Sequence, residues 1–193
     1  MTGLHEHDVA GDPIRQFEAW HAQAGRPAEM AVATASAQGS PSARMVLLKT
    51  VDEGGFAFYT NYAGAKARDL TVNPRAALLF FWPPGRQVRV AGPVMPTSTE
   101  ESDIYWRSRP RGSQLGAWAS HQSEVIDGRG ELERRLAEVT ARFPADVARP
   151  PFWGGFRVVP DTVEFWEHRD DRLHDRLRYR RQGTDWVVER LSP

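Results

Sequence analysis

Cationic side chains that could bind an anion gather in three short segments. They are residues 44–49 (RMVLLK), 107–113 (RSRPRGS) and 172–176 (RLHDR). Arginine predominates, since Lys49 and Lys66 are the only lysines, and its guanidinium grips planar oxyanions through paired N–H groups. High-GC coding would also favour arginine over the whole chain, but it does not explain the clusters. These segments are therefore candidate binding sites for an anionic ligand.

The segment 107–113 combines the features of a phosphate site. It joins two predicted helices, and basic side chains, the Ser113 hydroxyl and the amides of a helix start together bind phosphate well. Tyr105 adds a hydroxyl one helical turn before Arg109, on the same helix face. The alternative is an ordinary solvated basic loop.

The segment 172–176 alternates, so a strand would place Arg172, His174 and Arg176 on one side of a sheet. A histidine between two cations resists protonation, which favours a neutral hydrogen-bonding role for His174. The alternative is a surface strand whose arginines pair with the neighbouring aspartates.

The run 44–51 (RMVLLKTV) is rich in aliphatic residues and predicts one buried strand. Arg44 and Lys49 lie an odd number of residues apart, so such a strand directs them to opposite faces. Each could then meet a different ligand, or both could bracket the strand and point to solvent.

Other chemistries find little support. The sequence has no GxSxG, HExxH or phosphate-binding P-loop motif, and its six histidines show no metal-ligand spacing outside the first residues. It has no cysteine, which excludes disulfides, zinc–thiolate sites and thiol nucleophiles. No bound metal is expected. Four tryptophans that could wall a flat aromatic ligand are Trp82, Trp118, Trp153 and Trp166.

The elements that must position these residues are mostly hairpin-linked strands. Extended runs are predicted at 30–35, 44–51, 56–59, 76–82, 87–94, 156–159, 162–166, 176–181 and 186–191. Helices are predicted at 12–24, 63–72, 97–108 and 131–143, the last with Leu132, Leu136, Val139 and Phe143 on one face. This order predicts a mainly β fold with peripheral helices (α+β), an antiparallel barrel. We expect a flexible N-terminal arm over residues 1–11 and a single domain over 12–193.

Composition limits the class of protein. The chain has 193 residues and a formal net charge of zero, from 25 basic and 25 acidic residues, so nucleic acid is not an expected partner. No apolar run approaches the ~20 residues of a membrane span, and the start does not resemble a secretory signal. We expect a cytoplasmic protein without a membrane partner.

Together these segments resemble the pyridoxine/pyridoxamine 5′-phosphate oxidase family over residues 30–193. The resemblance rests on RMVLLK, FYTNY (58–62), NPRAALLFFW (73–82), RQVRV (86–90), SRPRGSQLGAWASHQS (108–123), PPFWGG (150–155), EFW (164–166), RLHDR and the ending RLSP. It implies an FMN-binding split barrel, a homodimer with FMN between the subunits, and a small phosphorylated or anionic aromatic substrate that reacts with O₂.

The resemblance also assigns roles to residues. It implies that the substrate phosphate is bound by Lys49, Tyr105, Arg109 and Ser113. It also implies that the substrate ring, beside the reacting carbon, is contacted by Arg172 and His174, the candidate catalytic pair. The residues that it implies for FMN binding are Arg44, Met45, Val46, Leu47, Leu48, Lys49, Tyr59, Thr60, Lys66, Gln87, Gln122, Ser123, Trp166 and Arg176. The implied reaction moves a hydride from the substrate C4′ carbon to flavin N5, and O₂ reoxidises the flavin with release of H₂O₂.

Two departures from the family pattern keep alternatives open. Ala65 stands where the family often has arginine, and no Arg-x-x-Tyr motif, which closes over the substrate in this family, precedes Asp12. A missing lid favours the related phenazine-biosynthesis flavin oxidases, which act on a reduced tricyclic dicarboxylate. The set Tyr105, Arg109 and Ser113 favours a vitamin B6 phosphate. A flavin- or pyridoxal-phosphate-binding protein without catalysis is the third alternative.

Overall fold

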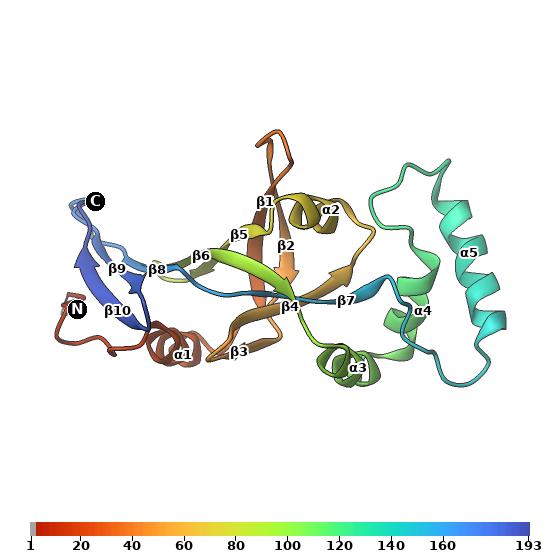
Figure 1. The fold of residues 1–193 in the computed structure, drawn as a ribbon, viewed down its shortest axis with the longest axis horizontal. Helices are drawn as coiled ribbons and strands as arrows, with labels where there is room; N and C mark the ends of the chain where they lie inside the picture. Colours follow the sequence, from red (N-terminus) through yellow and green to blue (C-terminus); the bar gives the residue numbers. More distant parts are fainter. Residues whose placement is uncertain (1–2) are drawn as a thin grey trace.

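A computed structural model describes residues 3–193 and shows a curved antiparallel sheet flanked by helices (Figure 1). The helices are α1 (Pro13–Gln23), α2 (Ala65–Val72), α3 (Thr99–Ser108), α4 (Arg111–Ala119) and α5 (Arg129–Arg142). The strands are β1 (Glu29–Ala35), β2 (Pro41–Leu47), β3 (Thr50–Asp52), β4 (Gly55–Asn61), β5 (Arg75–Trp82), β6 (Arg86–Pro96), β7 (Trp153–Val158), β8 (Thr162–Glu167), β9 (Asp175–Gln182) and β10 (Asp185–Arg190). The predicted antiparallel split barrel with peripheral helices is confirmed.

The long strand β6 divides the barrel because it changes partner along its length. Its first part, residues 86–91, pairs with β8, and residues 94–96 pair with β7. Gly92 lies at the change, where a Cβ atom would meet the carbonyl oxygen of Val159 at 1.9 Å, so no larger residue fits. One path of the sheet runs β10-β9-β8-β6-β5-β1-β2, and the other continues from β6 through β7 and β4 to β3.

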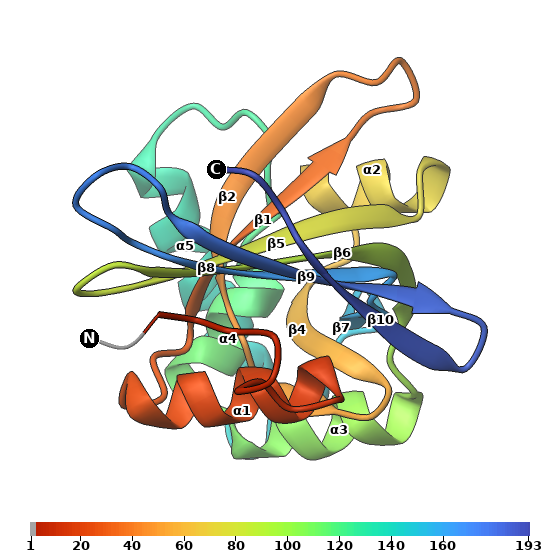
Figure 2. The same ribbon diagram turned by 90° about the vertical axis from the view of Figure 1, so that its left-hand side faces the viewer.

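Helix α1 closes one side of the barrel over the main hydrophobic core (Figure 2). Asp12 caps the helix by accepting hydrogen bonds from the amides of Ile14 and Arg15, and Pro13 occupies the first helical position. Phe17 is fully buried, and its ring packs edge-on against Phe56 and Phe80. These aromatic contacts hold α1 against the sheet.

A second, smaller core holds the helices at the other end of the molecule (Figure 1). Trp106 of α3 packs edge-on against Trp153 of β7, and its indole N–H donates to the carbonyl of Val147. Helix α5 forms where it was predicted and lies outside α4. None of its residues is fully buried, and Leu136 is 41% exposed. The predicted apolar face of α5 is therefore only partly covered.

The prediction of one buried strand over residues 44–51 is wrong. The chain breaks between β2 and β3, where the Leu48 amide donates to the Ala28 carbonyl and the Lys49 amide donates to the Ala57 carbonyl of β4. Leu48 turns into the core, whereas Met45 is 65% exposed on β2. Among the described strands, β2 pairs only with β1. Met45 and Leu47 therefore stay exposed, while Val46 packs partly buried against the main core. The parity argument for Arg44 and Lys49 does not apply.

The N-terminal segment lies against β9 and β10 (Figure 2). Leu4 is 7% exposed, and the Tyr179 hydroxyl donates to the carbonyl of Ala10 at 2.6 Å. The mobility of an arm over residues 1–11 and the domain boundary at residue 12 stay predictions, and residues 1–2 lie outside the described part. Among the helices described, none is both long enough and apolar enough to cross a membrane.

Candidate functional site

A cavity of about 450 Å³ opens between β2, β4 and the helices α2 to α4. It brings together many residues that the sequence placed on FMN or substrate. Predicted residues in its wall are Met45, Val46, Leu47, Lys49, Tyr59, Thr60, Lys66, Tyr105, Arg109, Ser113 and Gln122. With Trp153, which also lines it, segments up to 108 residues apart in the chain form one site, which we call the main cavity.

The main cavity is cationic. Lys49, Lys66 and Arg109 line it, and no aspartate or glutamate among residues 3–193 does. A cavity that gathers like charges without carboxylates favours an anionic occupant, because the ligand supplies the missing counter-charge. A phosphate or carboxylate group of a ligand would supply this counter-charge.

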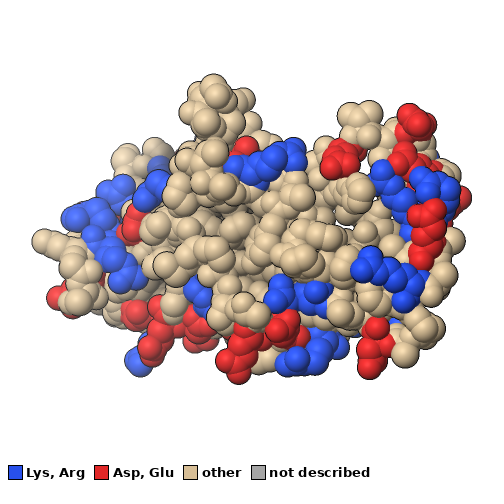
Figure 3. All heavy atoms as spheres, turned by 45° about the vertical axis from the view of Figure 1, so that its right-hand side comes forward, with Lys and Arg blue, Asp and Glu red and all other residues tan. Residues whose placement is uncertain are grey.

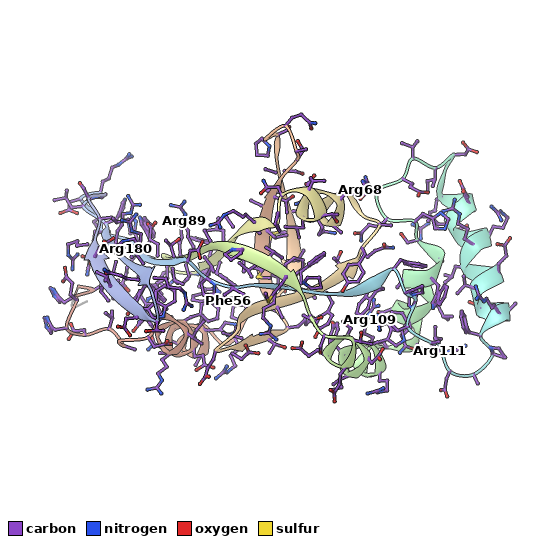
Figure 4. All side chains as sticks on the ribbon, viewed as in Figure 1. Phe56, Arg68, Arg89, Arg109, Arg111 and Arg180 are labelled. Atoms are coloured by element: carbon purple, nitrogen blue, oxygen red, sulfur yellow. The ribbon has the colours of Figure 1, made fainter. Side chains whose placement is uncertain are left out.

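Arg109 lies at the junction of α3 and α4 (Figure 4). Its guanidinium carbon lies 4.5 Å from the ring centroid of Trp153 and 5.1 Å from that of Trp106. Burial lowers the pKa of Arg109 below its ordinary value, and its buried Nη1 has no hydrogen-bond partner among the described residues. Buried donors are nearly always paired in native proteins. An anion in the main cavity would accept a hydrogen bond from Nη1 of Arg109.

The start of α4 adds hydrogen-bond donors beside Arg109. Pro110 precedes the helix and no side chain caps it, while Ser113 lies in its first turn and lines the main cavity. The uncapped amides and the positive end of the helix dipole attract anions. The structure thus brings Arg109, Ser113 and the start of α4 together at the main cavity, and binding of a phosphate there stays a prediction.

Lys66 is the second buried cation of the main cavity. Its Nζ donates to the Thr60 hydroxyl at 2.9 Å and to Oε1 of Gln122 at 2.7 Å. Both acceptors are neutral, so neither cancels the ammonium charge. Burial, with a smaller contribution from the positive charge of Arg44, lowers the pKa of Lys66. A phosphate bound nearby would stabilise the charged form of Lys66 and raise its pKa again.

Aromatic rings form one wall of the main cavity. The rings of Tyr59 and Tyr105 stack at 4.2 Å, and Trp153 lies nearly parallel to Tyr59 at 5.7 Å. The Lys49 ammonium lies 5.4 Å from the centroid of the Tyr105 ring. A flat wall next to cations suits a planar ligand that carries an anionic group.

A second cavity, of about 220 Å³, collects the remaining predicted residues (the second cavity below). Gln87, Trp166 and Arg176 lie opposite one another on β6, β8 and β9, because the strand register aligns them in one row. The His174 ring lies 4.6 Å from that of Trp166. The two cavities share no lining residue. In Figure 1, β8 and β9 of the second cavity lie to the left, whereas β2, β4, α3 and α4 of the main cavity lie in the middle and to the right.

The prediction that Arg172 and His174 share a strand face with Arg176 is wrong. Strand β9 begins at Asp175, and residues 168–174 form the loop that joins it to β8. Arg172 adopts a left-handed backbone with φ of 64° and does not line either cavity. A seven-residue connection is too long for strand alternation to extend through it, which periodicity alone did not reveal.

Three other predicted residues lie outside both cavities. Leu48 is buried in the main core, and the Ser123 hydroxyl accepts a hydrogen bond from the Ala65 amide at 3.1 Å. Arg44 donates to the hydroxyls of Thr34 and Ser42, each at 2.7 Å. Its positive charge contributes to lowering the pKa of Lys66, and its Nη2 lies 4.0 Å from Oδ2 of Asp69.

Some cavity residues were not predicted. Asn61, Gly116, Ala117 and Ser120 line the main cavity, and Arg89, Glu164 and Pro193 line the second. Asn61 follows Tyr59 and Thr60 on β4, a proximity that could have revealed it. Glu164 is 8% exposed and accepts from both Arg89 and Arg176, a role that only the sheet register discloses.

The four tryptophans have separate positions. Trp153 lines the main cavity and Trp166 the second. Trp82 lies in the main core at 2% exposure, and Trp118 packs against Phe143. The prediction of a shared aromatic wall fails for these two, because hydrophobic contacts inside each core take up their rings.

Comparison with known proteins identifies the family of this chain. A family described as pyridoxamine 5′-phosphate oxidase matches residues 17–143, and one described as the pyridoxine 5′-phosphate oxidase C-terminal dimerisation region matches residues 153–193. The chain belongs to the pyridoxamine 5′-phosphate oxidase family. Pyridoxine/pyridoxamine 5′-phosphate oxidases of Rubrobacter xylanophilus and Burkholderia vietnamiensis are 57% and 53% identical to it, covering 100% of this chain and 92% and 94% of those proteins.

Solved structures of the family share the fold. PhzG from Burkholderia lata 383, in complex with tetrahydrophenazine-1-carboxylic acid, is 34% identical with a TM-score of 0.92, covering 98% of each chain. A pyridoxamine 5′-phosphate oxidase-related, FMN-binding protein from Nostoc punctiforme is 20% identical with a TM-score of 0.76, covering 96% of this chain and 100% of that one. The chain thus shares the fold of these two proteins.

Proposed function

We propose that this chain is an FMN-dependent oxidase that converts pyridoxamine and pyridoxine 5′-phosphate to pyridoxal 5′-phosphate and reduces O₂ to H₂O₂. The observation that carries the proposal is the main cavity, in which Lys49, Lys66 and Arg109 face no carboxylate. The identity of 57% to a pyridoxine/pyridoxamine 5′-phosphate oxidase supports the same substrate class.

The substrate phosphate would bind to Lys49, Tyr105, Arg109 and Ser113. All four line the main cavity, and the unpartnered Nη1 of Arg109 is the donor that most needs an acceptor. Two hydroxyls and two cations can surround a phosphate dianion with charge-assisted hydrogen bonds. Holding the phosphate would fix where the substrate ring lies, which lowers the entropic part of the barrier.

FMN fits the residues of both cavities. Its phosphate would bind near Lys66 and Arg44, since Lys66 is buried with only neutral partners. Other residues proposed for FMN are Met45, Val46, Leu47, Leu48, Lys49, Tyr59, Thr60, Gln87, Gln122, Ser123, Trp166 and Arg176. When bound, FMN would supply the hydride acceptor for the substrate C4′ carbon and the route by which the electron pair reaches O₂.

A homodimer would bring the two cavities together. Strand β2 has an unpaired edge in the chain, and Met45 and Leu47 on it, with Phe81 on β5, expose 65%, 45% and 63% of their surfaces. Figure 3 shows a broad area free of Lys, Arg, Asp and Glu in the middle of one face. Exposed apolar patches of this kind mark protein interfaces, and residues 153–193 match a dimerisation region. The second cavity of one subunit would then complete the main cavity of its partner.

Within that assembly, Arg172 and His174 would lie beside the substrate ring. His174 lines the second cavity with Arg176, so it reaches the substrate only if a partner subunit supplies the main cavity. These residues would orient the C4′ carbon through hydrogen bonds and charge, which requires no nucleophile.

The test is the production of H₂O₂ by the flavin-loaded protein with pyridoxamine 5′-phosphate and with pyridoxine 5′-phosphate. Unphosphorylated pyridoxamine is the matched control, because it lacks only the group that the main cavity is proposed to bind. Turnover of the phosphates and a much higher KM for the control are expected. An absence of turnover with both phosphates refutes the proposed function.

A second candidate is a phenazine-type oxidase. The observation that favours it is the TM-score of 0.92 to PhzG, whose bound ligand is a carboxylic acid. A carboxylate would also satisfy Arg109. Turnover of a reduced phenazine carboxylate, with none of either vitamin phosphate, would select this candidate.

A further inference from the structure

The hydrogen bonds of the β8–β9 loop assign a protonation state to His174. The backbone N–H of Arg169 donates to Nδ1 of His174 at 3.0 Å. A backbone N–H can only donate, so Nδ1 carries no proton. The neutral imidazole therefore has its proton on Nε2, which is the only remaining polar group of the ring and the one available to a ligand in the second cavity.

The arginine that fixes this tautomer is held by a carboxylate at the start of β9. Nε of Arg169 donates to Oδ2 of Asp175 at 2.7 Å. The Leu4 amide donates to the same oxygen at 3.2 Å, and Nη1 of Arg190 donates to Oδ1 at 2.9 Å. Burial alone would raise the pKa of Asp175, but these hydrogen bonds outweigh it and lower the pKa. Asp175 thus remains a charged anchor.

The N-terminal segment braces this anchor from behind. Arg190 donates to both carboxylate oxygens of Glu6, at 2.8 and 2.9 Å, and to the carbonyl of Leu4 at 2.7 Å. Leu4 is 7% exposed in the core. Gly3 packs against the loop so closely that a Cβ atom on it would lie 2.7 Å from Nη2 of Arg169. Residues 3–6, Asp175 and the β8–β9 loop therefore form one connected network.

We infer that residues 3–6 form a strap that positions His174 through Asp175 and Arg169 and holds its ring as the Nε2–H tautomer. The inference rests on the proposed function for what His174 acts on. The N-terminal segment has no Arg-x-x-Tyr motif, and it contacts the candidate catalytic loop instead. Glu6, Asp175 and Arg190 are positioning residues, since they act through the loop and contact neither cavity.

The tautomer can be measured directly in the full-length protein. Selective ¹⁵N labelling of histidine with long-range ¹H–¹⁵N NMR distinguishes a protonated from an unprotonated ring nitrogen, and the His174→Gln spectrum assigns the signal. The native protein is expected to show Nε2 protonated and Nδ1 unprotonated. Asp175→Asn leaves one acceptor oxygen and no charge, so its His174 signal is expected to shift toward a mixture of tautomers.

Kinetics give the second readout. We expect kcat to fall about tenfold in Asp175→Asn and about threefold in Glu6→Ala, with bound FMN unchanged, because misplaced reacting groups reduce turnover more than binding. Glu133→Ala is the matched control, since it removes an exposed glutamate–arginine pair on α5, and it should leave kcat and the His174 signal as in the native protein.

The inference is overturned if Asp175→Asn and Glu6→Ala both keep the native His174 signal, or if the native protein carries its proton on Nδ1. If Asp175→Asn does not fold, the exposed Glu6→Ala variant decides, because a native-like signal in it removes the strap from the argument. The NMR measurement does not need turnover. It therefore stands even if the oxidase proposal fails.

Discussion

Replacing Arg109 with glutamine should weaken binding of the phosphorylated substrate far more than it weakens the fold. The guanidinium lies between Trp106 and Trp153, and its buried Nη1 has no partner among the described residues. A hydrogen bond to a charged group contributes about 1.5–3 kcal/mol, and 1.4 kcal/mol is a factor of ten. The variant should therefore raise the KM for pyridoxamine 5′-phosphate about tenfold to a hundredfold.

The effect on stability should be small because two contributions oppose each other. The variant loses two cation–π contacts, each about 0.5–1 kcal/mol. It also removes a cation whose burial without a counter-charge lowers its pKa. For a chain of this size, the thermal midpoint of the ligand-free protein should fall by less than about 5 °C.

The assay for this variant is steady-state H₂O₂ formation with the phosphate substrate and with unphosphorylated pyridoxamine. Arg107→Gln is the matched control, since Arg107 lies two residues earlier on α3 and is exposed outside the main cavity. Only Arg109→Gln should lose the preference for the phosphate. An unchanged KM in Arg109→Gln, or an equal rise in Arg107→Gln, would refute the assignment of Arg109 to the anion.

Three further substitutions test other parts of the proposal. Arg44→Ala should weaken FMN binding about tenfold or more, because a charge-assisted contact is lost, and fluorescence titration with FMN measures this; unchanged affinity would remove Arg44 from the cofactor site. His174→Ala should lower kcat about tenfold while FMN stays bound, and loss of flavin from the purified variant would contradict its place on the substrate. Phe81→Glu puts a charge on a side chain that is 63% exposed and should yield monomers in light scattering; an intact dimer would move the interface elsewhere.

The sequence alone specified the fold class and several local structures. Asp12 followed by Pro13 is typical of a helix start and begins α1. At α3 the sequence leaves Ser98 or Thr99 as the cap, and the structure shows Ser98 in a capping box with Glu101. These features depend on residues a few positions apart, so local propensity decides them. The segment 107–113 was identified for the same reason, since its basic, hydroxyl and helix-start groups are neighbours in the chain.

Local patterns misled where a strand is short or a loop interrupts it. The run 44–51 is aliphatic and predicts one strand, yet the chain turns at Leu48 to enter the core, and β2 stays exposed. Alternation at 172–176 predicts a shared face, yet β9 begins at Asp175. Periodicity records which residues avoid water, and it does not record whether a partner chain or the same chain covers them.

The sequence by itself determined that the chain is an antiparallel barrel carrying clusters of arginine and a recognisable set of family motifs, because residue type and spacing carry that information. Only the tertiary structure decided which of the predicted residues lie together in each cavity. Strand register placed Gln87, Trp166 and Arg176 in one row, while the β2–β3 connection, α2 and the α3–α4 junction brought Lys49, Lys66 and Arg109 together around another cavity. It also joined Leu4 to Asp175 across 171 residues of sequence and Glu6 to Arg190 across 184. Contacts over such separations come from sheet pairing and packing, which no local pattern contains.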